Sequence, residues 1–141
     1  MENVLLALGT NVGDREQNIR TALEKLDKAF GRHYEALSPL LETEAIGFDG
    51  PPFINCIVRY RLGRTPLSIL KICKGVEREM GRMDVPEYDD AGKRVYHDRI
   101  IDIDILFVGK RRISTDELTI PHPQVESRPY IKELLLHLQL K

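Results

Sequence analysis

The start of the chain has the pattern of a buried strand followed by an amphipathic helix. The apolar run 3–8 ends in the turn-rich segment 9–14, which predicts a strand leading into a loop. Asp14 then resembles a helix N-cap, with Gln17 three residues later as in a capping box, and Gly31 is a typical helix stop. We expect this helix to cover a sheet with the apolar face formed by Ile19, Leu23, Leu26 and Phe30.

The next segment predicts two strands. Residues 34–44 read as a strand that Pro39 interrupts, and a proline there favours an edge position or a bulge. After a glycine- and proline-rich turn, 53–62 alternates in the manner of a strand, with Ile54 on one face and Asn55 on the other. Asn55 is therefore expected to be an amide among apolar neighbours.

A second covering helix follows this strand. Thr65 is a candidate N-cap and Pro66 suits the first helical position, so we expect a helix that runs to Met80 and stops at Gly81. The predicted inward positions are Leu67, Leu70, Cys73 or Lys74, Val76 and Met80.

The remaining chain begins with a long polar segment. Residues 82–98 have no apolar period, and a loop of this length in a compact domain is typically functional or mobile, so we expect a mobile catalytic loop at about 82–98. Residues 100–108 then give the strongest strand pattern in the chain, and Gly109 with Lys110 predicts a hairpin into 111–113. Residues 130–138 predict a short last helix.

The order of predicted elements is strand, helix, strand, strand, helix, strand, strand, helix. This order favours an α+β, ferredoxin-like sandwich, in which helices cover a mainly antiparallel sheet. A parallel, doubly wound sheet is a weaker alternative, because Gly9 and Gly13 do not form a GxGxxG pattern and the strand connections are too short for crossovers. With 141 residues, we expect 1–141 to form a single domain.

Charge and cysteine content narrow the class of partner. Lys and Arg total 21 against 22 Asp and Glu, so no basic field exists for nucleic acid or an anionic membrane. The apolar runs are far shorter than the ~18–20 residues that span a bilayer. We therefore expect a cytoplasmic protein that binds neither partner. Cys56 and Cys73 lack metal or disulfide-framework spacing and predict buried, reduced thiols.

Two carboxylates on one predicted strand are the strongest chemical signal. Asp102 and Asp104 should leave the same face, while the isoleucines between and beside them enter the core. Such a pair is often merely solvated or bound to nearby arginine. Carboxylates brought together need cations, however, and Mg²⁺ typically takes one or two carboxylates plus phosphate oxygens. A metal-bound polyphosphate is favoured by the cations nearby in sequence, which are Arg82, Arg94, Arg99, His122 and Arg128.

A second group of residues suits a flat heteroaromatic ring. Phe53 offers an aromatic face, and Asn55 and Thr43 offer hydrogen-bonding groups that could read the polar edge of such a ring. The alternative is that Phe53 and Asn55 are ordinary core residues, with the Asn55 amide satisfied inside the protein. Candidate neighbours are Gly9, Thr10, Phe48 and Tyr96.

Taken together, the motifs resemble a known enzyme family. The chain contains in order residues 7–11 (ALGTN), Glu42-Thr43 followed by residues 53–55 (FIN), Glu77 through Gly81-Arg82, residues 99–106 (RIIDIDIL) and residues 118–123 (LTIPHP). This series, from about residue 3 to residue 130, closely resembles the 6-hydroxymethyl-7,8-dihydropterin pyrophosphokinase family of folate biosynthesis. The pairing of RxxDxD with LTxPHP is the most specific part of the match.

The resemblance implies a ferredoxin-like fold and Mg²⁺-dependent transfer of pyrophosphate from ATP to 6-hydroxymethyl-7,8-dihydropterin, giving AMP and the pterin diphosphate. By position in the motifs, Asp102 and Asp104 would bind two Mg²⁺ ions. The implied catalytic residues are Arg82, Arg99, Asp102 and Asp104. ATP would contact Glu77, Arg82, Arg99, Ile105, Thr119, His122 and Arg128. The pterin would contact Thr43, Ile46, Phe53, Asn55, Tyr96 and Tyr130.

Two other classes of function stay open at this point. One is a non-catalytic nucleotide- or pterin-binding module of the same fold, which the retention of both Asp102 and Asp104 disfavours because binding alone does not need two metals. The other is an RNA-binding sheet, which would need exposed aromatic residues and a basic face. The net charge of −1 disfavours it. We expect a monomer whose partners are ATP and the pterin.

Overall fold

An antiparallel sheet forms the centre of the structure, a computed structural model that describes residues 1–45, 50–81, 87–88, 90–92, 94–95 and 100–139. The strands lie in the order β2-β4-β1-β7, and β3 pairs with the same side of β4 as β2 does. All of these pairings are antiparallel. The strand bounds are β1 Glu2–Thr10, β2 Ala36–Leu37, β3 Leu41–Thr43, β4 Phe53–Leu62 and β7 Asp102–Val108.

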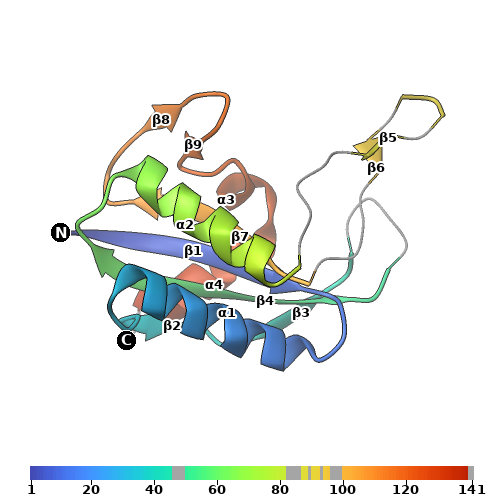
Figure 1. Ribbon diagram of the computed structural model, residues 1–141, viewed down its shortest axis with the longest axis horizontal. Coiled ribbons are helices and arrows are strands. Elements are labelled where there is room, and N and C mark those ends of the chain that lie inside the picture. The colour runs from blue at the N-terminus through green and yellow to red at the C-terminus, as the bar shows by residue number, and fades with distance from the viewer. Residues whose placement is uncertain (46–49, 82–86, 89, 93, 96–99, 140–141) are drawn as a thin grey trace.

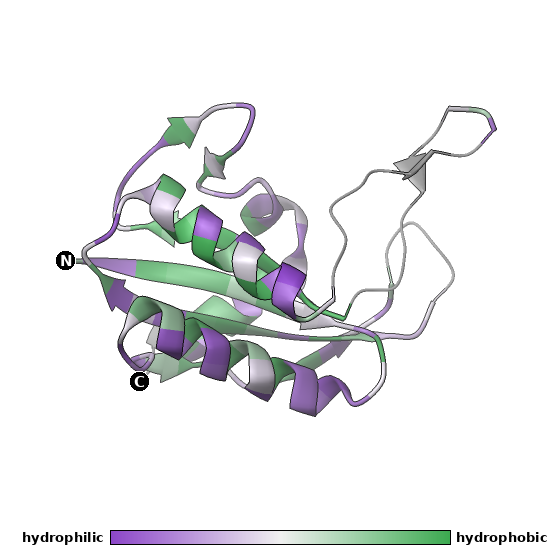
Figure 2. Cartoon of the chain, in the orientation of Figure 1, coloured by the Kyte–Doolittle hydropathy of each residue, from purple (hydrophilic) through white to green (hydrophobic). Residues whose placement is uncertain are grey.

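One face of this sheet packs against two long helices, α1 (Arg15–Phe30) and α2 (Pro66–Glu79). Figure 1 shows the two helices side by side across β1 and β4. We call this sheet surface the closed face. Figure 2 shows strongly apolar colour along the central strands and mixed colour on both helices, the pattern of a core covered by amphipathic helices. The strands contribute Val4, Leu6, Leu8, Cys56, Val58, Tyr60, Ile101, Ile103 and Ile105 to this core.

The opposite face carries a smaller apolar cluster under α4 (Pro129–Gln139) and the short α3 (Gln124–Ser127), which lie behind the sheet in Figure 1. We call it the site face. Its cluster centres on Ile57, Leu106, Ile131 and Leu134, with Leu5 and Ala7 packed against it. A register shift between Leu5 and Leu6 marks a bulge in the β1–β7 ladder. This bulge lets Leu106 lie in this cluster while Val108 lies in the other.

The first half of the predicted element pattern is confirmed. Asp14 caps α1 by accepting a hydrogen bond from the Gln17 N–H at 3.1 Å, and Gly31 ends the helix in the left-handed region with φ 74°. The strand 53–62 has the predicted bounds. Pro39 does split 34–44 into the two edge pieces β2 and β3. At the break, the Ser38 hydroxyl accepts a hydrogen bond from the Ile57 N–H at 2.8 Å and thus replaces a backbone partner.

The predicted inward face of the second helix is partly wrong. Leu67 is 51% exposed, whereas Ile69 is fully buried two positions later. Cys73 and Val76 are buried as expected, and Glu77 completes this stripe. Pro66 at the first helical position occupies the contact with the core that we assigned to Leu67, so the buried stripe runs 66, 69, 73, 76 and 77.

The predicted hairpin from 100–108 into 111–113 is also wrong. The strand begins at Asp102, and β8 (Ile113–Ser114) pairs instead with β9 (Thr119–Ile120) in a separate two-stranded sheet. Thr115 explains the preference: its N–H and hydroxyl both donate to the Leu118 carbonyl oxygen, which closes a tight turn between β8 and β9. The short α3 was not predicted.

The segment 82–98 is described only in part, and its expected mobility stays a prediction. Within it, β5 (Glu87–Tyr88) and β6 (Arg94–Val95) pair as a small antiparallel ladder. The α+β, ferredoxin-like class of fold is confirmed by the sheet order and by the helices on its faces. None of the helices among the described residues is both long and apolar enough to cross a membrane.

Candidate active site

The register of the sheet aligns the two predicted groups of site residues in one row. Gly9 on the central strand β1 is paired with Asn55 on β4 and with Asp102 on β7. Cross-strand partners project to the same face, so the Asn55 amide and the Asp102 carboxylate both lie on the site face. Two steps of ~4.8 Å between strands separate their backbones by roughly 10 Å. The row therefore joins the amide group to the carboxylate group across a single strand.

Gly9 allows a close approach in the middle of this row. A methyl group on Gly9 would lie 2.9 Å from Asn55 Oδ1 and 3.6 Å from the Phe53 ring. Asn55 Oδ1 thus lies over the central strand, in space that any larger residue at position 9 would fill. The absence of a side chain at Gly9 leaves room for this amide oxygen beside Phe53.

Asn55 is held firmly in this position. It is 7% exposed, and its Nδ2 donates to Thr43 Oγ1 at 2.7 Å and to the Leu41 carbonyl oxygen at 3.3 Å. Phe53, two residues earlier on the same face, pairs with Thr43. The structure therefore brings Thr43, Phe53 and Asn55 together, as the sequence indicated.

The two aspartates lie on β7 as predicted. Asp102 and Asp104 are partly buried on the site face, while Ile103 is buried in the core of the closed face. Asp104 pairs with Ala7, so the neighbouring row also has a small residue on its central strand. This arrangement presents two carboxylates next to a part of the sheet that carries little side-chain volume.

A buried glutamate fixes the backbone between the aspartates. Glu77 on α2 is fully buried, and its Oε2 accepts a hydrogen bond from the Ile103 N–H at 2.9 Å. Lys74 Nζ lies 3.6 Å from Glu77 Oε1. A carboxylate that binds a backbone N–H in this way is a strong hydrogen-bond acceptor, and here it ties β7 to α2. We expected Glu77 to contact ATP; the structure shows it in contact with β7.

His122 approaches the aspartates from the segment after β9. Its Nε2 lies 3.8 Å from Asp104 Oδ1, and its Nδ1 accepts a hydrogen bond from the Gln124 N–H at 3.1 Å. The neutral imidazole therefore carries its proton on Nε2, toward the carboxylate. Burial lowers the pKa of His122 below its ordinary value; the nearby Asp102 opposes this effect and Arg128 adds to it. His122 is thus a neutral hydrogen-bond donor near neutral pH.

Arg128 and Tyr130 complete this side of the site. Arg128 Nη1 donates to the Tyr130 hydroxyl at 3.4 Å. Burial raises the pKa of Tyr130, the Arg128 hydrogen bond and charge oppose that rise, and the Asp104 and Asp102 charges add to it. Tyr130 therefore lies close enough to the two aspartates for their charges to act on its hydroxyl.

The other predicted site residues fall into two groups. Ile105 is buried in the core of the closed face, so its side chain does not lie on the site face, and Thr119 is exposed on β9. The remaining predictions lie outside the described residues; they are Ile46, Phe48, Arg82, Tyr96 and Arg99.

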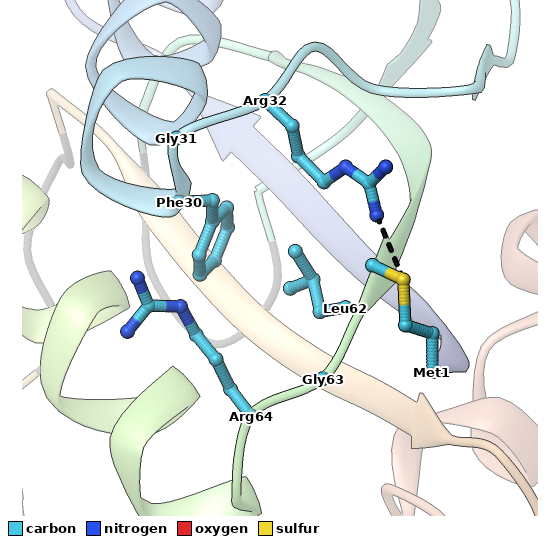
Figure 3. A pocket seen from close by; sticks show the side chains of 7 residues that line it. All are labelled: Met1, Phe30, Gly31, Arg32, Leu62, Gly63 and Arg64. Carbon is cyan, nitrogen blue, oxygen red and sulfur yellow. Dashed lines mark hydrogen bonds between the residues drawn. The ribbon is translucent and has the colours of Figure 1, made fainter.

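The structure also has an open cleft at the opposite end of the β1–β4 pair (Figure 3). Arg32 there donates to the Arg61 carbonyl oxygen and to Met1 Sδ, the latter at 3.3 Å, and Arg64 donates to the Ala29 carbonyl oxygen at 3.4 Å. Both guanidinium groups thus donate hydrogen bonds to other parts of the protein. They lie near the C-terminal end of α1, where the helix dipole disfavours a bound anion. The described residues that line the cleft include no acid; they are Met1, Phe30, Gly31, Arg32, Leu62, Gly63 and Arg64.

The donor set of the site suits a hard cation. No group of three or more His, Cys, Asp or Glu side chains arranged for a metal occurs within the described part of the chain. Two oxygen donors that leave most coordination positions to water and phosphate are the arrangement that Mg²⁺ prefers. Zinc sites typically need three or four protein ligands. Asp102 and Asp104 therefore fit Mg²⁺ in the presence of a polyphosphate.

Sequence reasoning missed two residues that hold the surroundings of the site. Asn11 Nδ2 donates to the Pro51 carbonyl oxygen at 3.1 Å, and Arg15 Nη1 donates to the Pro52 carbonyl oxygen at 2.9 Å. A basic residue directly after an N-cap is unfavourable to the helix dipole. The unfavourable position of Arg15 at the positive end of the helix dipole therefore indicated that this residue has a tertiary role.

Comparisons with known proteins agree with one another. The family model described as 7,8-dihydro-6-hydroxymethylpterin-pyrophosphokinase (HPPK) matches residues 5–140. A 2-amino-4-hydroxy-6-hydroxymethyldihydropteridine pyrophosphokinase of Porphyromonas gingivalis is 42% identical over 134 residues, covering 94% of this chain and 87% of that protein. A folate synthesis bifunctional protein of Arabidopsis thaliana is 39% identical over 138 residues, covering 97% of this chain and 27% of that protein.

The fold has a solved counterpart. A crystal structure described as HPPK-DHPS in complex with substrates aligns with a TM-score of 0.61 and 16% identity. The alignment covers 98% of this chain, which spans 39% of that longer one. At this level of identity the match bears on the fold alone, and it agrees with the α+β sandwich described above.

Proposed function

Because this chain belongs to the 7,8-dihydro-6-hydroxymethylpterin-pyrophosphokinase family, we propose that its site face carries out the reaction of that family. The reaction is ATP-dependent transfer of a pyrophosphoryl group to hydroxymethyldihydropterin in folate synthesis. In our proposal, Asp102 and Asp104 hold the polyphosphate through Mg²⁺, and Asn55 with Phe53 holds the pterin.

The row Asn55–Gly9–Asp102 carries this proposal. An in-line transfer requires the acceptor oxygen and the transferring phosphorus to be held next to each other. The roughly 10 Å between the backbones of Asn55 and Asp102 suits a fused two-ring heterocycle whose polar edge meets the Asn55 amide. Its hydroxymethyl group would then point toward the carboxylates.

The proposed metal content is two Mg²⁺ ions. When bound, Mg²⁺ neutralises phosphate charge and aligns the phosphate oxygens for displacement. Asp102 and Asp104 would supply the protein oxygens, and the ordering of their backbone by Glu77 at Ile103 holds both carboxylates in place before substrates arrive.

Hydrogen-bond donors on this side would meet the remaining phosphate charge, and Arg128 would add a positive charge. His122, with its proton on Nε2, and Arg128, beside the Tyr130 hydroxyl, would donate hydrogen bonds to ATP phosphates. The family resemblance assigns Arg82 and Arg99 to the transferring group, and Thr119 and Ile105 to the nucleotide. In our proposal, Ile46 and Tyr96 complete the pterin contacts.

No protein nucleophile is needed in this scheme. Phosphoryl-type transfer depends mainly on positioning and charge stabilisation, and two aligned substrates can react directly. The expected monomeric state and cytoplasmic location stay predictions.

An assay of AMP release tests the proposal directly. The protein is incubated with ATP and Mg²⁺, with and without 6-hydroxymethyl-7,8-dihydropterin, and the nucleotide products are separated. We expect AMP that requires both the pterin and the metal. Formation of ADP would contradict pyrophosphoryl transfer. Binding of pterin or ATP without turnover would instead support a non-catalytic binding module.

A further inference from the structure

Arg15 connects three elements at the edge of the proposed pterin site. It is the first residue of α1, and its guanidinium contacts two groups outside that helix. Nη1 donates to the Pro52 carbonyl oxygen at 2.9 Å, and Nη2 lies 3.1 Å from Glu42 Oε2 on β3. The Arg15 side chain is only 28% exposed. A planar guanidinium can make both contacts at once through its two separate NH2 groups, whereas lysine has a single ammonium group and no such fork.

The helix itself gains nothing from a cation here. The N-terminus of α1 carries the positive end of the helix dipole, which disfavours Arg15 and favours the neighbouring Glu16. The contacts with Glu42 and Pro52 compensate for that local cost. A residue that breaks a local rule and is satisfied only by tertiary partners points to a role outside its own element.

A second donor supports the same stretch of backbone. Asn11 is 1% exposed, and its Nδ2 donates to the Pro51 carbonyl oxygen at 3.1 Å. The turn that carries Asn11 is itself fixed by Asn18, whose Nδ2 donates to Thr10 Oγ1 at 3.1 Å and to the Val12 carbonyl oxygen at 2.7 Å. The backbone just before β4 is thus tied at two consecutive carbonyl groups, Pro51 to this turn and Pro52 to the start of α1.

These ties act on the residues that would hold the pterin. Pro52 directly precedes Phe53, and Glu42 lies between Leu41 and Thr43, the two partners of the Asn55 amide. Because alternate residues face opposite sides, Glu42 projects away from Asn55. Arg15 therefore holds β3 and the start of β4 from the outside, without reaching the site face.

We propose that Arg15 is a positioning residue for the pterin half of the site. By bridging Glu42 and Pro52, it fixes the spacing between Thr43 and Phe53 and so the orientation of the Asn55 amide. The inference rests on the function proposed above. It assigns Arg15 to acceptor binding and to neither ATP binding nor the transfer step.

The test compares Arg15→Ala with Arg20→Ala, a matched arginine on the same helix that forms an exposed pair with Glu16 at 3.8 Å. Steady-state kinetics and equilibrium binding are measured separately for the pterin and for Mg²⁺-ATP, and circular dichroism checks the fold. For Arg15→Ala we expect the pterin Kd and KM to rise about tenfold, a change of the size set by one charge-assisted hydrogen bond. The Kd for ATP and the kcat at saturating pterin should change less than about twofold, and Arg20→Ala should leave all four unchanged.

Two milder variants keep the test informative if Arg15→Ala unfolds. Arg15→Lys retains the charge but not the fork, and should recover only part of the pterin affinity. Glu42→Gln should weaken pterin binding by roughly two- to threefold, and its effect should vanish in an Arg15→Ala background, because both changes break the same bridge.

Three results would overturn the assignment. Unchanged pterin affinity in Arg15→Ala, equal losses of pterin and ATP affinity, or the same loss in Arg20→Ala would each show that Arg15 has no specific part in acceptor binding. If the wild-type protein itself binds no pterin, the proposed function falls and this inference falls with it. Wild-type binding with an unaffected Arg15→Ala variant overturns this inference alone.

Discussion

Three strands of the central sheet, β1, β4 and β7, contribute side chains to both of its faces, but the two faces differ in the residues that they carry and in the helices that cover them. On the closed face, Leu8, Cys56 and Ile103 are at most 4% exposed under α1 and α2. On the site face, their neighbours in sequence are Gly9, Asn55 and Asp102. Since side chains alternate along a strand, stability and chemistry are divided between alternate residues of the same segments.

The site face is itself divided. Toward the Leu5 end of β1, α4 covers it and forms an apolar cluster with Ile57 and Leu106. Toward the Gly9 end, the small side chains of β1 and the polar side chains of its neighbours replace that cluster. A binding site arises where a packed layer stops and the strands continue beyond it. Substitutions on each face should therefore have different effects on turnover and on stability.

The largest effect is expected on the site face at Asp104. Asp104→Ala should lower kcat by roughly three orders of magnitude, because a carboxylate that aligns metal-bound phosphate contributes several kcal/mol to the transition state. The thermal stability should hold or rise slightly, since removal of one charge relieves repulsion from Asp102. AMP release and a thermal melt measure the two effects. Near-normal turnover would refute the role of Asp104, and Glu133→Ala, an exposed acid on α4, is the matched control.

On the closed face, a substitution of Ile69 should lower stability and leave turnover nearly unchanged. This side chain is fully buried, so Ile69→Ala should lower the free energy of unfolding by about 2–5 kcal/mol. The kcat of the folded fraction should change little. Leu67→Ala, two residues earlier on α2 at a position that is 51% exposed, should cost less than about 1 kcal/mol. Denaturant titration of both variants checks this, and equal losses would contradict the buried register of α2.

A smaller effect is expected at Gly9, in the middle of the row that joins Asn55 to Asp102. Gly9→Ala would place a methyl group 2.9 Å from Asn55 Oδ1, and overpacking of this kind costs about 1–3 kcal/mol. The pterin KM should therefore rise about tenfold or more as the amide is displaced. Gly75→Ala on α2 meets no atom within 4 Å and should instead stabilise the helix by roughly 0.5–1 kcal/mol. Unchanged pterin binding in Gly9→Ala would separate Asn55 from the site.

The smallest effect concerns the thiols of the closed face. Burial raises the pKa of Cys56 to about 12, and burial together with the Glu77 and Asp104 charges raises that of Cys73 further. Neither thiol should form the reactive thiolate at pH 8. Mass spectrometry after treatment with iodoacetamide should find no modification of the native protein and two modified cysteines after denaturation. Rapid labelling of the native protein would show that the closed face opens.

Prediction from the sequence succeeded where a pattern is local. The bounds of the strand 53–62, the cap at Asp14 and the stop at Gly31 were all predicted, because each depends on a few adjacent residues. Prediction failed where a strand has two possible pairing partners nearby in the sequence. Position 113 was assigned to a hairpin with the preceding strand, but the turn closed by Thr115 and Leu118 gives it a different partner.

The candidate site shows the same limit. Asp102 and Asp104 were predicted to share a face, and Thr43, Phe53 and Asn55 to form a group, and the geometry agrees with both predictions. The contact of Glu77 with Ile103 was not predicted, because it joins a helix to a strand 26 residues away. The bridge made by Arg15 was missed for the same reason.

The sequence by itself determined which side chains alternate, where the helices begin, and that two carboxylates leave one face of a strand, since these properties repeat within two to four residues. Only the tertiary structure decided that Asn55, Gly9 and Asp102 lie in one row. That alignment depends on the register of two ladders, and register is selected by burying the apolar faces of all three strands together. A slip of one residue would leave each local pattern intact and would turn the aspartates into the core.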